Sequence, residues 1–93
     1  MSDWPFAAPR NQAVFSARQI MAGQKPILLV CHDADSGDWQ FLTGDTVQMK
    51  DAVLVTLGSI VKLDESVAEL ADLPEGWSAS RVRPGAPWTR QEE

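Results

Sequence analysis

Two stretches decide the fold: Ile27-Leu28-Leu29-Val30-Cys31-His32 and Trp39-Gln40-Phe41-Leu42-Thr43. The first is a short apolar run bounded by Pro26 and by turn residues, which predicts a strand buried on both faces in the middle of a sheet. The second alternates, so that Trp39, Phe41 and Thr43 share one face. Residues 33–38 between them are rich in Asp, Ser and Gly, and the two stretches therefore predict a hairpin.

A third strand and two helical segments are predicted after the hairpin. Residues 53–57 form a β-rich apolar run. One short helical turn follows, with apolar residues at Leu57, Ile60 and Val61. A further helix begins at Asp64 or Ser66, because residues 66–69 have the spacing of a capping box. Its apolar face carries Val67, Leu70 and Ala71. Residues 73–76 contain Pro and Gly and end this helix.

The last segment predicts a strand and a turn. Residues 77–82 alternate along the chain. One face of this strand carries Trp77, Ala79 and Arg81. Pro84-Gly85 then turns the chain towards Trp88.

The N-terminal part predicts an irregular arm and one short helix. Residues 1–12 contain two prolines and no hydrophobic period. Trp4 and Phe6 are expected to lie across the domain or a partner, because exposed apolar area costs roughly 25 cal/mol per Å². Ser16-Ala17-Arg18-Gln19 has capping-box spacing, which predicts a helix over residues 17–22.

Together these elements predict an α+β fold in a single domain of residues 13–93, preceded by the arm at residues 1–12. The sheet is expected to be mainly antiparallel, with about four or five strands and two or three short helices, because the strands cluster rather than alternate with helices. A half-open barrel is the competing architecture.

Length and composition exclude several classes of protein. The 93 residues are 44% hydrophobic and 23% charged, which is ordinary for one folded domain. The longest apolar run, residues 27–31, is far below the roughly 20 residues of a membrane helix. Asp3 stands where a signal peptide carries positive charge, so the expected location is the cytoplasm. No role in or on a membrane is expected.

Cys31 and His32 are the first candidates for catalysis, since the chain has one residue of each type. Neighbours in a strand point to opposite faces, so these two cannot act as a nucleophile and its base. Cys31 is expected to be a buried, inert thiol. His32 is either a general base tuned by Asp33 and Asp35 or a strand-end histidine bonded to the turn.

Residues 33–37 also resemble the start of a calcium-binding loop. An EF-hand requires a bidentate glutamate at its twelfth position, and that position is Gly44 here. A solvated hairpin turn explains the same residues without a metal. Glycine-rich phosphate loops, serine triads and paired cysteine motifs are missing from the sequence. We therefore expect no enzymatic activity, no cofactor and no metal.

The charge is unevenly distributed along the chain, whose net charge is −5. Residues 33–51 contain five acids against Lys50, and residues 64–75 contain five acids and no base. Residues 81–90 reverse the sign, with three arginines and no acid. The acidic middle repels phosphate and disfavours nucleic-acid binding, although arginines near tryptophans have the composition of a base-stacking surface.

Three blocks, followed by an arginine and Trp88, occur in a recognisable order. The blocks are Asp35-Ser36-Gly37-Asp38-Trp39-Gln40-Phe41-Leu42-Thr43-Gly44-Asp45, Leu57-Gly58-Ser59-Ile60-Val61-Lys62-Leu63-Asp64 and Leu73-Pro74-Glu75-Gly76-Trp77. In this order, over residues 26–90, the chain resembles a small bacterial domain of unknown function that is classed as immunity protein 33 of polymorphic toxin systems. The resemblance implies a protein that neutralises a secreted toxin by covering its active site, and it brings no catalytic residues.

This resemblance and the acidic charge together suggest a basic protein toxin as the partner. The candidate partner-binding residues are Asp35, Asp45 and Asp72 and, in a second region, Trp77, Arg81 and Trp88. The alternative is that the acid excess serves solubility. In that case the chain is a small cytosolic housekeeping or ligand-binding domain.

Overall fold

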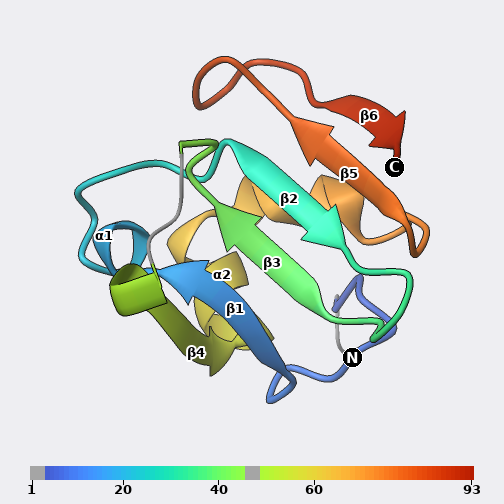
Figure 1. Ribbon diagram of the computed structural model, residues 1–93, viewed down its shortest axis with the longest axis horizontal. Helices are drawn as coiled ribbons and strands as arrows, with labels where there is room; N and C mark the ends of the chain where they lie inside the picture. Colours follow the sequence, from blue (N-terminus) through green and yellow to red (C-terminus); the bar gives the residue numbers. More distant parts are fainter. Residues whose placement is uncertain (1–3, 46–48) are drawn as a thin grey trace.

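A six-stranded sheet forms the centre of the computed structural model, which describes residues 4–45 and 49–93 (Figure 1). The strands are β1 (Ala13–Ala17), β2 (Leu29–His32), β3 (Trp39–Leu42), β4 (Ala52–Thr56), β5 (Trp77–Ser80) and β6 (Thr89–Glu92), in the order β4-β1-β3-β2-β5-β6. The helices are α1 (Arg18–Met21) and α2 (Leu57–Leu63), with 3-10 helices η1 (Met49–Asp51) and η2 (Glu65–Leu70). The predicted α+β class is confirmed. None of these helices has the length and apolar character needed to cross a membrane.

The sheet has more strands than expected and is mixed. Five strands or fewer were expected, whereas β1 and β6 bring the number to six. β1 and β3 are parallel, and every other neighbouring pair is antiparallel. A parallel pair requires a crossover, and here α1 and β2 lie between β1 and β3 in the chain.

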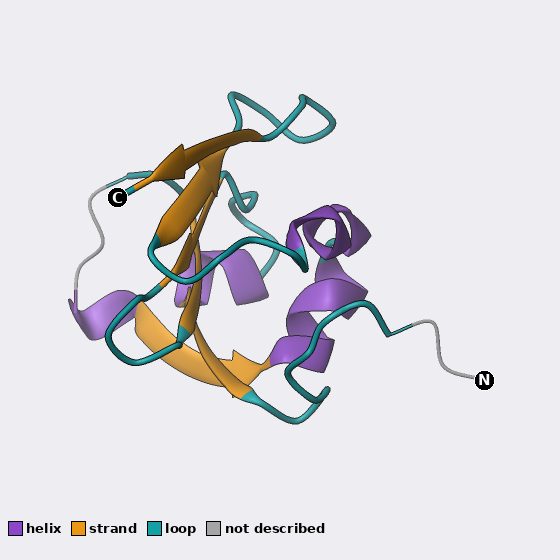
Figure 2. Ribbon diagram, turned by 90° about the vertical axis from the view of Figure 1, so that its right-hand side faces the viewer, coloured by secondary structure: helices purple, strands orange, loops and turns teal. Residues whose placement is uncertain are grey.

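The predicted hairpin of β2 and β3 lies at the middle of the sheet. Val30 pairs with Phe41 and His32 pairs with Trp39 in an antiparallel register. Val30 and Phe41 are fully buried, but Leu29 and Cys31 on the other face of β2 are only half-buried. The expectation of a strand buried on both faces is therefore wrong, because α2 and η2 cover one face of the sheet and leave the other without such a layer (Figure 2).

The two helical segments on the covered face begin at side-chain caps. Thr56 Oγ1 accepts a hydrogen bond of 3.2 Å from the Ser59 amide at the start of α2. Asp64 Oδ1 accepts one of 3.0 Å from the Ser66 amide at the start of η2. The cap is thus Asp64, and the capping box predicted for residues 66–69 does not form. Val67 and Leu70 are buried, as their spacing predicted, although η2 is a 3-10 helix rather than an α-helix.

The segment around Ser16 is a strand where a helix start was predicted. Ser16 lies in β1, is 1% exposed, and donates a hydrogen bond of 3.0 Å to the Phe41 carbonyl. The short helix predicted over residues 17–22 is present as α1, but it begins at Arg18, after an Ala17 cap that makes no side-chain hydrogen bond. The capping-box prediction is wrong because the hydroxyl bonds to the neighbouring strand rather than to its own helix.

The N-terminal arm is irregular, as predicted, and its described part packs on the domain. Phe6 is 5% exposed and meets Trp39 edge-on, with ring centroids 5.4 Å apart. Trp4 Nε1 donates a hydrogen bond of 2.7 Å to the Ala8 carbonyl. The Arg10 guanidinium lies 4.5 Å from the centre of the Trp4 ring. Phe6 thus belongs to the hydrophobic core, and Trp4 and Ala8 pack against it.

Candidate functional site

Acidic residues from separate segments gather at one end of the sheet, where β2 and β6 end and β3 and β5 begin. The Gly76 amide donates to the His32 carbonyl at 2.7 Å, and the Glu93 amide donates to the Gly76 carbonyl at 2.8 Å. The Glu75 carboxylate lies close to the hairpin loop, since a Cβ atom added at Gly37 would be 3.8 Å from Glu75 Oε1. These contacts bring together the group that we name the acidic end: Asp33, Asp35, Asp38, Glu75, Glu92 and Glu93.

The loop that contributes Asp35 is fixed by its own hydrogen bonds. Asp33 Oδ1 accepts from the amides of Asp35 at 2.7 Å and Ser36 at 3.3 Å. The Asp33 amide donates to the Asp38 carbonyl at 2.8 Å, which closes the hairpin. Asp33 is thus occupied in holding the turn, while Asp35 is exposed. Across the described ranges 4–45 and 49–93, no three His, Cys, Asp or Glu side chains are arranged to hold a metal ion.

His32 lies directly beneath the acidic end and is held on two sides. Its ring stacks on Trp39 with centroids 3.9 Å apart. Its Nδ1 lies 2.8 Å from the Leu73 carbonyl, and since a carbonyl accepts only, Nδ1 is the protonated nitrogen. Of the two roles considered for His32, the contacts favour the histidine that is bonded to a turn.

Cys31 lies on the opposite face of β2 from His32. Burial raises the pKa of its thiol, and the nearby carboxylates of Glu93 and Asp33 raise it further. The thiol is half-buried rather than fully buried. The raised pKa disfavours the thiolate, which is the nucleophilic form.

The three candidate aspartates do not form one surface. Asp35 belongs to the acidic end, whereas Asp45 follows β3 at its other end and forms an ion pair with Lys25 at 3.2 Å. Asp72 follows η2 and pairs with Arg90 at 2.9 Å. The hydrogen bond from Arg90 holds the pKa of the Asp72 carboxyl below its ordinary value.

Arg81 lies in the interior and is unsuitable for contact with a partner, because its side chain is 1% exposed. Its Nε donates to the Ile27 carbonyl at 3.0 Å, and its terminal nitrogens donate to Ser66 Oγ at 2.8 Å and Asp64 Oδ2 at 2.6 Å. The guanidinium also stacks on Trp88, 4.3 Å from the ring centre. Arg81 therefore joins β5 to the start of η2 and to the segment before β2.

Both candidate tryptophans are half-buried and adjoin other features of the molecule. Trp77 begins β5 in register with His32 and Glu92, so it lies at the acidic end. Trp88 covers Arg81 and precedes β6. Trp77 thus lies in the same region as Asp35, whereas Trp88 packs on Arg81.

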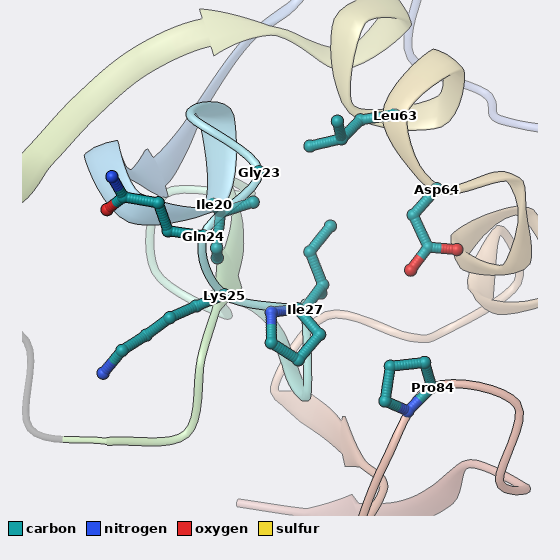
Figure 3. A pocket seen from close by; sticks show the side chains of 9 residues that line it. Ile20, Gly23, Gln24, Lys25, Ile27, Leu63, Asp64 and Pro84 are labelled. Carbon is teal, nitrogen blue, oxygen red and sulfur yellow. The ribbon is translucent and has the colours of Figure 1, made fainter.

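A hollow of about 390 Å³ lies beside Asp64 (Figure 3). Its lining consists of Ile20, Gly23, Gln24, Lys25, Pro26, Ile27, Leu63, Asp64 and Pro84. Figure 3 shows the Lys25 side chain extending away from the hollow. Because three separate segments of the chain form this lining, no local motif in the sequence indicates it.

The face of the sheet opposite α2 and η2 is partly apolar. Phe15 is 39% exposed and Leu54 is 63% exposed, and the two residues pair in register across β1 and β4. A groove of about 220 Å³ lies beside them. Its lining consists of Phe15, Ser16, Gln40, Leu42, Met49 and Ala52. We call this surface the open face.

Comparisons with known proteins give no relative from which a function could be transferred. No protein-family model, curated protein or solved structure matches the chain.

Proposed function

We propose that this chain is a non-enzymatic protein-binding module that engages a basic partner through its acidic end. The observation that carries the proposal is the convergence of residues 33–38, Glu75 and residues 92–93 at one end of the sheet. These segments contain acids and no lysine or arginine. A surface of one sign attracts a partner of the opposite sign and raises the rate of association.

The more specific form of the proposal is an immunity protein that acts in the cytoplasm. The resemblance to the immunity protein 33 class supports it, and so does the net charge of −5, which suits a basic toxin. The partner is then a protein toxin whose active site is covered by the acidic end. Trp77, half-buried at the same end, supplies apolar contact area beside the carboxylates.

The surroundings of His32 and Cys31 support a binding role over an enzymatic one. His32 Nδ1 is committed to the Leu73 carbonyl. The Cys31 thiol has a raised pKa. The two side chains lie on opposite faces of β2, so they do not act on one substrate.

The test is a charge reversal of the acidic end against a matched reversal elsewhere. The first variant combines Asp35→Lys, Glu75→Lys and Glu93→Lys, and the control combines Asp45→Lys, Glu65→Lys and Glu69→Lys. All six residues are exposed, and both variants change the net charge equally. Thermal unfolding establishes first that both variants are folded.

Association is then measured with a basic protein toxin from the native host, together with growth rescue on co-expression of that toxin. The first variant is expected to associate about tenfold more slowly than the control at low salt, and the difference should shrink as salt rises. Equal association rates for the two variants would refute the acidic end as the interface. Absence of growth rescue by the unmodified chain would refute the immunity role.

A second candidate function is the binding of a small ligand in the hollow beside Asp64. Its volume of about 390 Å³ and its apolar residues Ile20, Ile27 and Leu63 favour this alternative. The test is NMR screening of small molecules, in which a ligand should shift the Gly23 and Leu63 amides. Shifts confined to other parts of the chain would contradict this second function.

A further inference from the structure

β4 is an edge strand with a free side. It pairs with β1, and it is the first strand in the order of the sheet (Figure 1). Within the described residues, no strand pairs with its outer side. Its five residues, Ala-Val-Leu-Val-Thr, carry no charge.

The backbone of β4 has a definite set of outward hydrogen-bonding groups. The Leu57 amide donates to the Gln12 carbonyl at 2.9 Å, which fixes the phase of the antiparallel ladder. Hydrogen-bonded pairs alternate along such a ladder, so Val53 and Val55 bond to β1. The amides of Ala52, Leu54 and Thr56 therefore point away from β1.

The other edge of the sheet is protected where β4 is not. β6 reads Thr-Arg-Gln-Glu, and all four of its residues are exposed. Charged side chains on an edge strand oppose pairing with another strand. β4 contains no lysine, no proline and no inward-pointing charge, which are among the features that protect edge strands. The two edges thus differ in their capacity to accept a further strand.

We propose that a second copy of this chain pairs with β4 across a two-fold axis at Leu54. In this register Leu54 pairs with Leu54 of the second copy and Ala52 pairs with Thr56, so the outward groups of each copy face those of the other. The two sheets become one continuous sheet. The exposed Leu54 side chains meet at the axis, each beside its own Phe15, and form one apolar strip on the open face.

The distribution of charge favours a second copy at this edge rather than at the opposite one. Residues 49–63 contain two lysines and one aspartate, in a chain whose net charge is −5. The acidic end is formed by β2, β3, β5 and β6, and β4 is separated from these strands by β1. Two copies therefore meet through β4 without bringing their acidic ends together.

The test is the mass of the full chain in solution, measured by analytical ultracentrifugation over a wide concentration range. The mass is expected to double with rising concentration. Leu54→Lys should weaken the dimer at least about tenfold, because two like charges would then be directly opposite each other. The matched control is Val82→Lys, which adds the same charge at a residue that is 78% exposed and lies outside β4.

Amide hydrogen exchange of the unmodified chain tests the same pairing without a variant. The Leu54 amide should exchange freely at low protein concentration and become protected at high concentration, whereas the Val55 amide, bonded to β1, should be protected at both. A monomer at every concentration would overturn the proposal and leave the edge to a strand of another protein. A dimer that survives Leu54→Lys, or that forms without protection of Leu54, would also overturn it.

Discussion

The ion pair of Arg81 with Asp64 and that of Lys25 with Asp45 lie in opposite environments. The Arg81 and Asp64 side chains are 1% and 26% exposed, whereas those of Lys25 and Asp45 are 51% and 69% exposed. Charges in water are screened and contribute little to folding, while a buried charge is tolerated only when its hydrogen bonds are satisfied. The comparison separates charged groups that hold the fold together from charged groups at the surface that contribute little to it.

The interior pair also differs in the number of segments that it joins. Arg81 bonds to the Ile27 carbonyl, to Ser66 and to Asp64, and it stacks on Trp88. The Lys25 ammonium joins a single exposed carboxylate. Loss of the Arg81 side chain therefore removes a hydrogen-bond donor from the Ile27 carbonyl, from Ser66 and from Asp64. Loss of the Lys25 side chain removes a donor from the Asp45 carboxylate, which water can solvate instead.

The largest expected effect is that of Arg81→Met, which keeps the apolar stem and removes the charge. It should lower the free energy of unfolding by about 3 kcal/mol, because Asp64 Oδ2 and the buried Ile27 carbonyl lose the donor that Arg81 provides. Urea unfolding monitored by tryptophan fluorescence measures it. Arg83→Met at an exposed position is the control and should change stability by less than about 0.5 kcal/mol. Equal losses in the two variants would show that the interior network does not hold the fold.

The hairpin and β4 could be predicted from sequence because their patterns match their environments. Val30, in an apolar run, and Trp39 and Phe41, in an alternating stretch, are all buried on the covered face of the sheet. Residues of β1 alternate in the same way, but Ser16 and Gln19 also have the spacing of a helix start. The hydrogen bond from Ser16 to the Phe41 carbonyl in β3, far away in the sequence, favours the strand. β6 has no apolar residue, so its pairing with β5 depends on backbone bonds that no side-chain pattern encodes.

The candidate site was less predictable than the fold. The sequence shows that Arg81 is charged, but its burial depends on Asp64 and Ser66, which arrive from a different segment. The acidic end likewise depends on strand register, since Glu93 reaches the hairpin loop only because β6 pairs with β5. The number of acids along the chain therefore indicates Asp35 but groups it with Asp45 and Asp72, which lie elsewhere in the structure.

A smaller effect is expected from the protonation of Asp64. Burial raises the pKa of this carboxyl, but hydrogen bonds from Ser66 and Arg81 outweigh burial and leave the pKa below its ordinary value. A folded-state pKa below the unfolded value of about 3.9 gives stability that is complete above that pH and is lost as pH falls through the folded value.

Unfolding free energies measured between neutral pH and the acid limit should therefore fall less steeply for Asp64→Asn than for the unmodified chain. Asp72→Asn provides the comparison at the surface. Its pKa is also lowered, by the hydrogen bond from Arg90, but its side chain is 78% exposed and solvent screens the pair. Equal pH slopes for Asp64→Asn and the unmodified chain would contradict the role given to the interior carboxylate.

The smallest expected effect is that of Asp45→Ala at the exposed pair. Its carboxylate bonds to Lys25 at 3.2 Å, and both side chains are largely in water. Exposed pairs of this kind contribute about 0 to 1 kcal/mol, so urea unfolding should place the variant within about 0.5 kcal/mol of the unmodified chain. The Asp45 amide bonds to Thr43 Oγ1, and this contact does not depend on the aspartate side chain. A loss as large as that of Arg81→Met would mean that this exposed pair holds the fold as strongly as the interior pair, and the distinction between the two environments would fail.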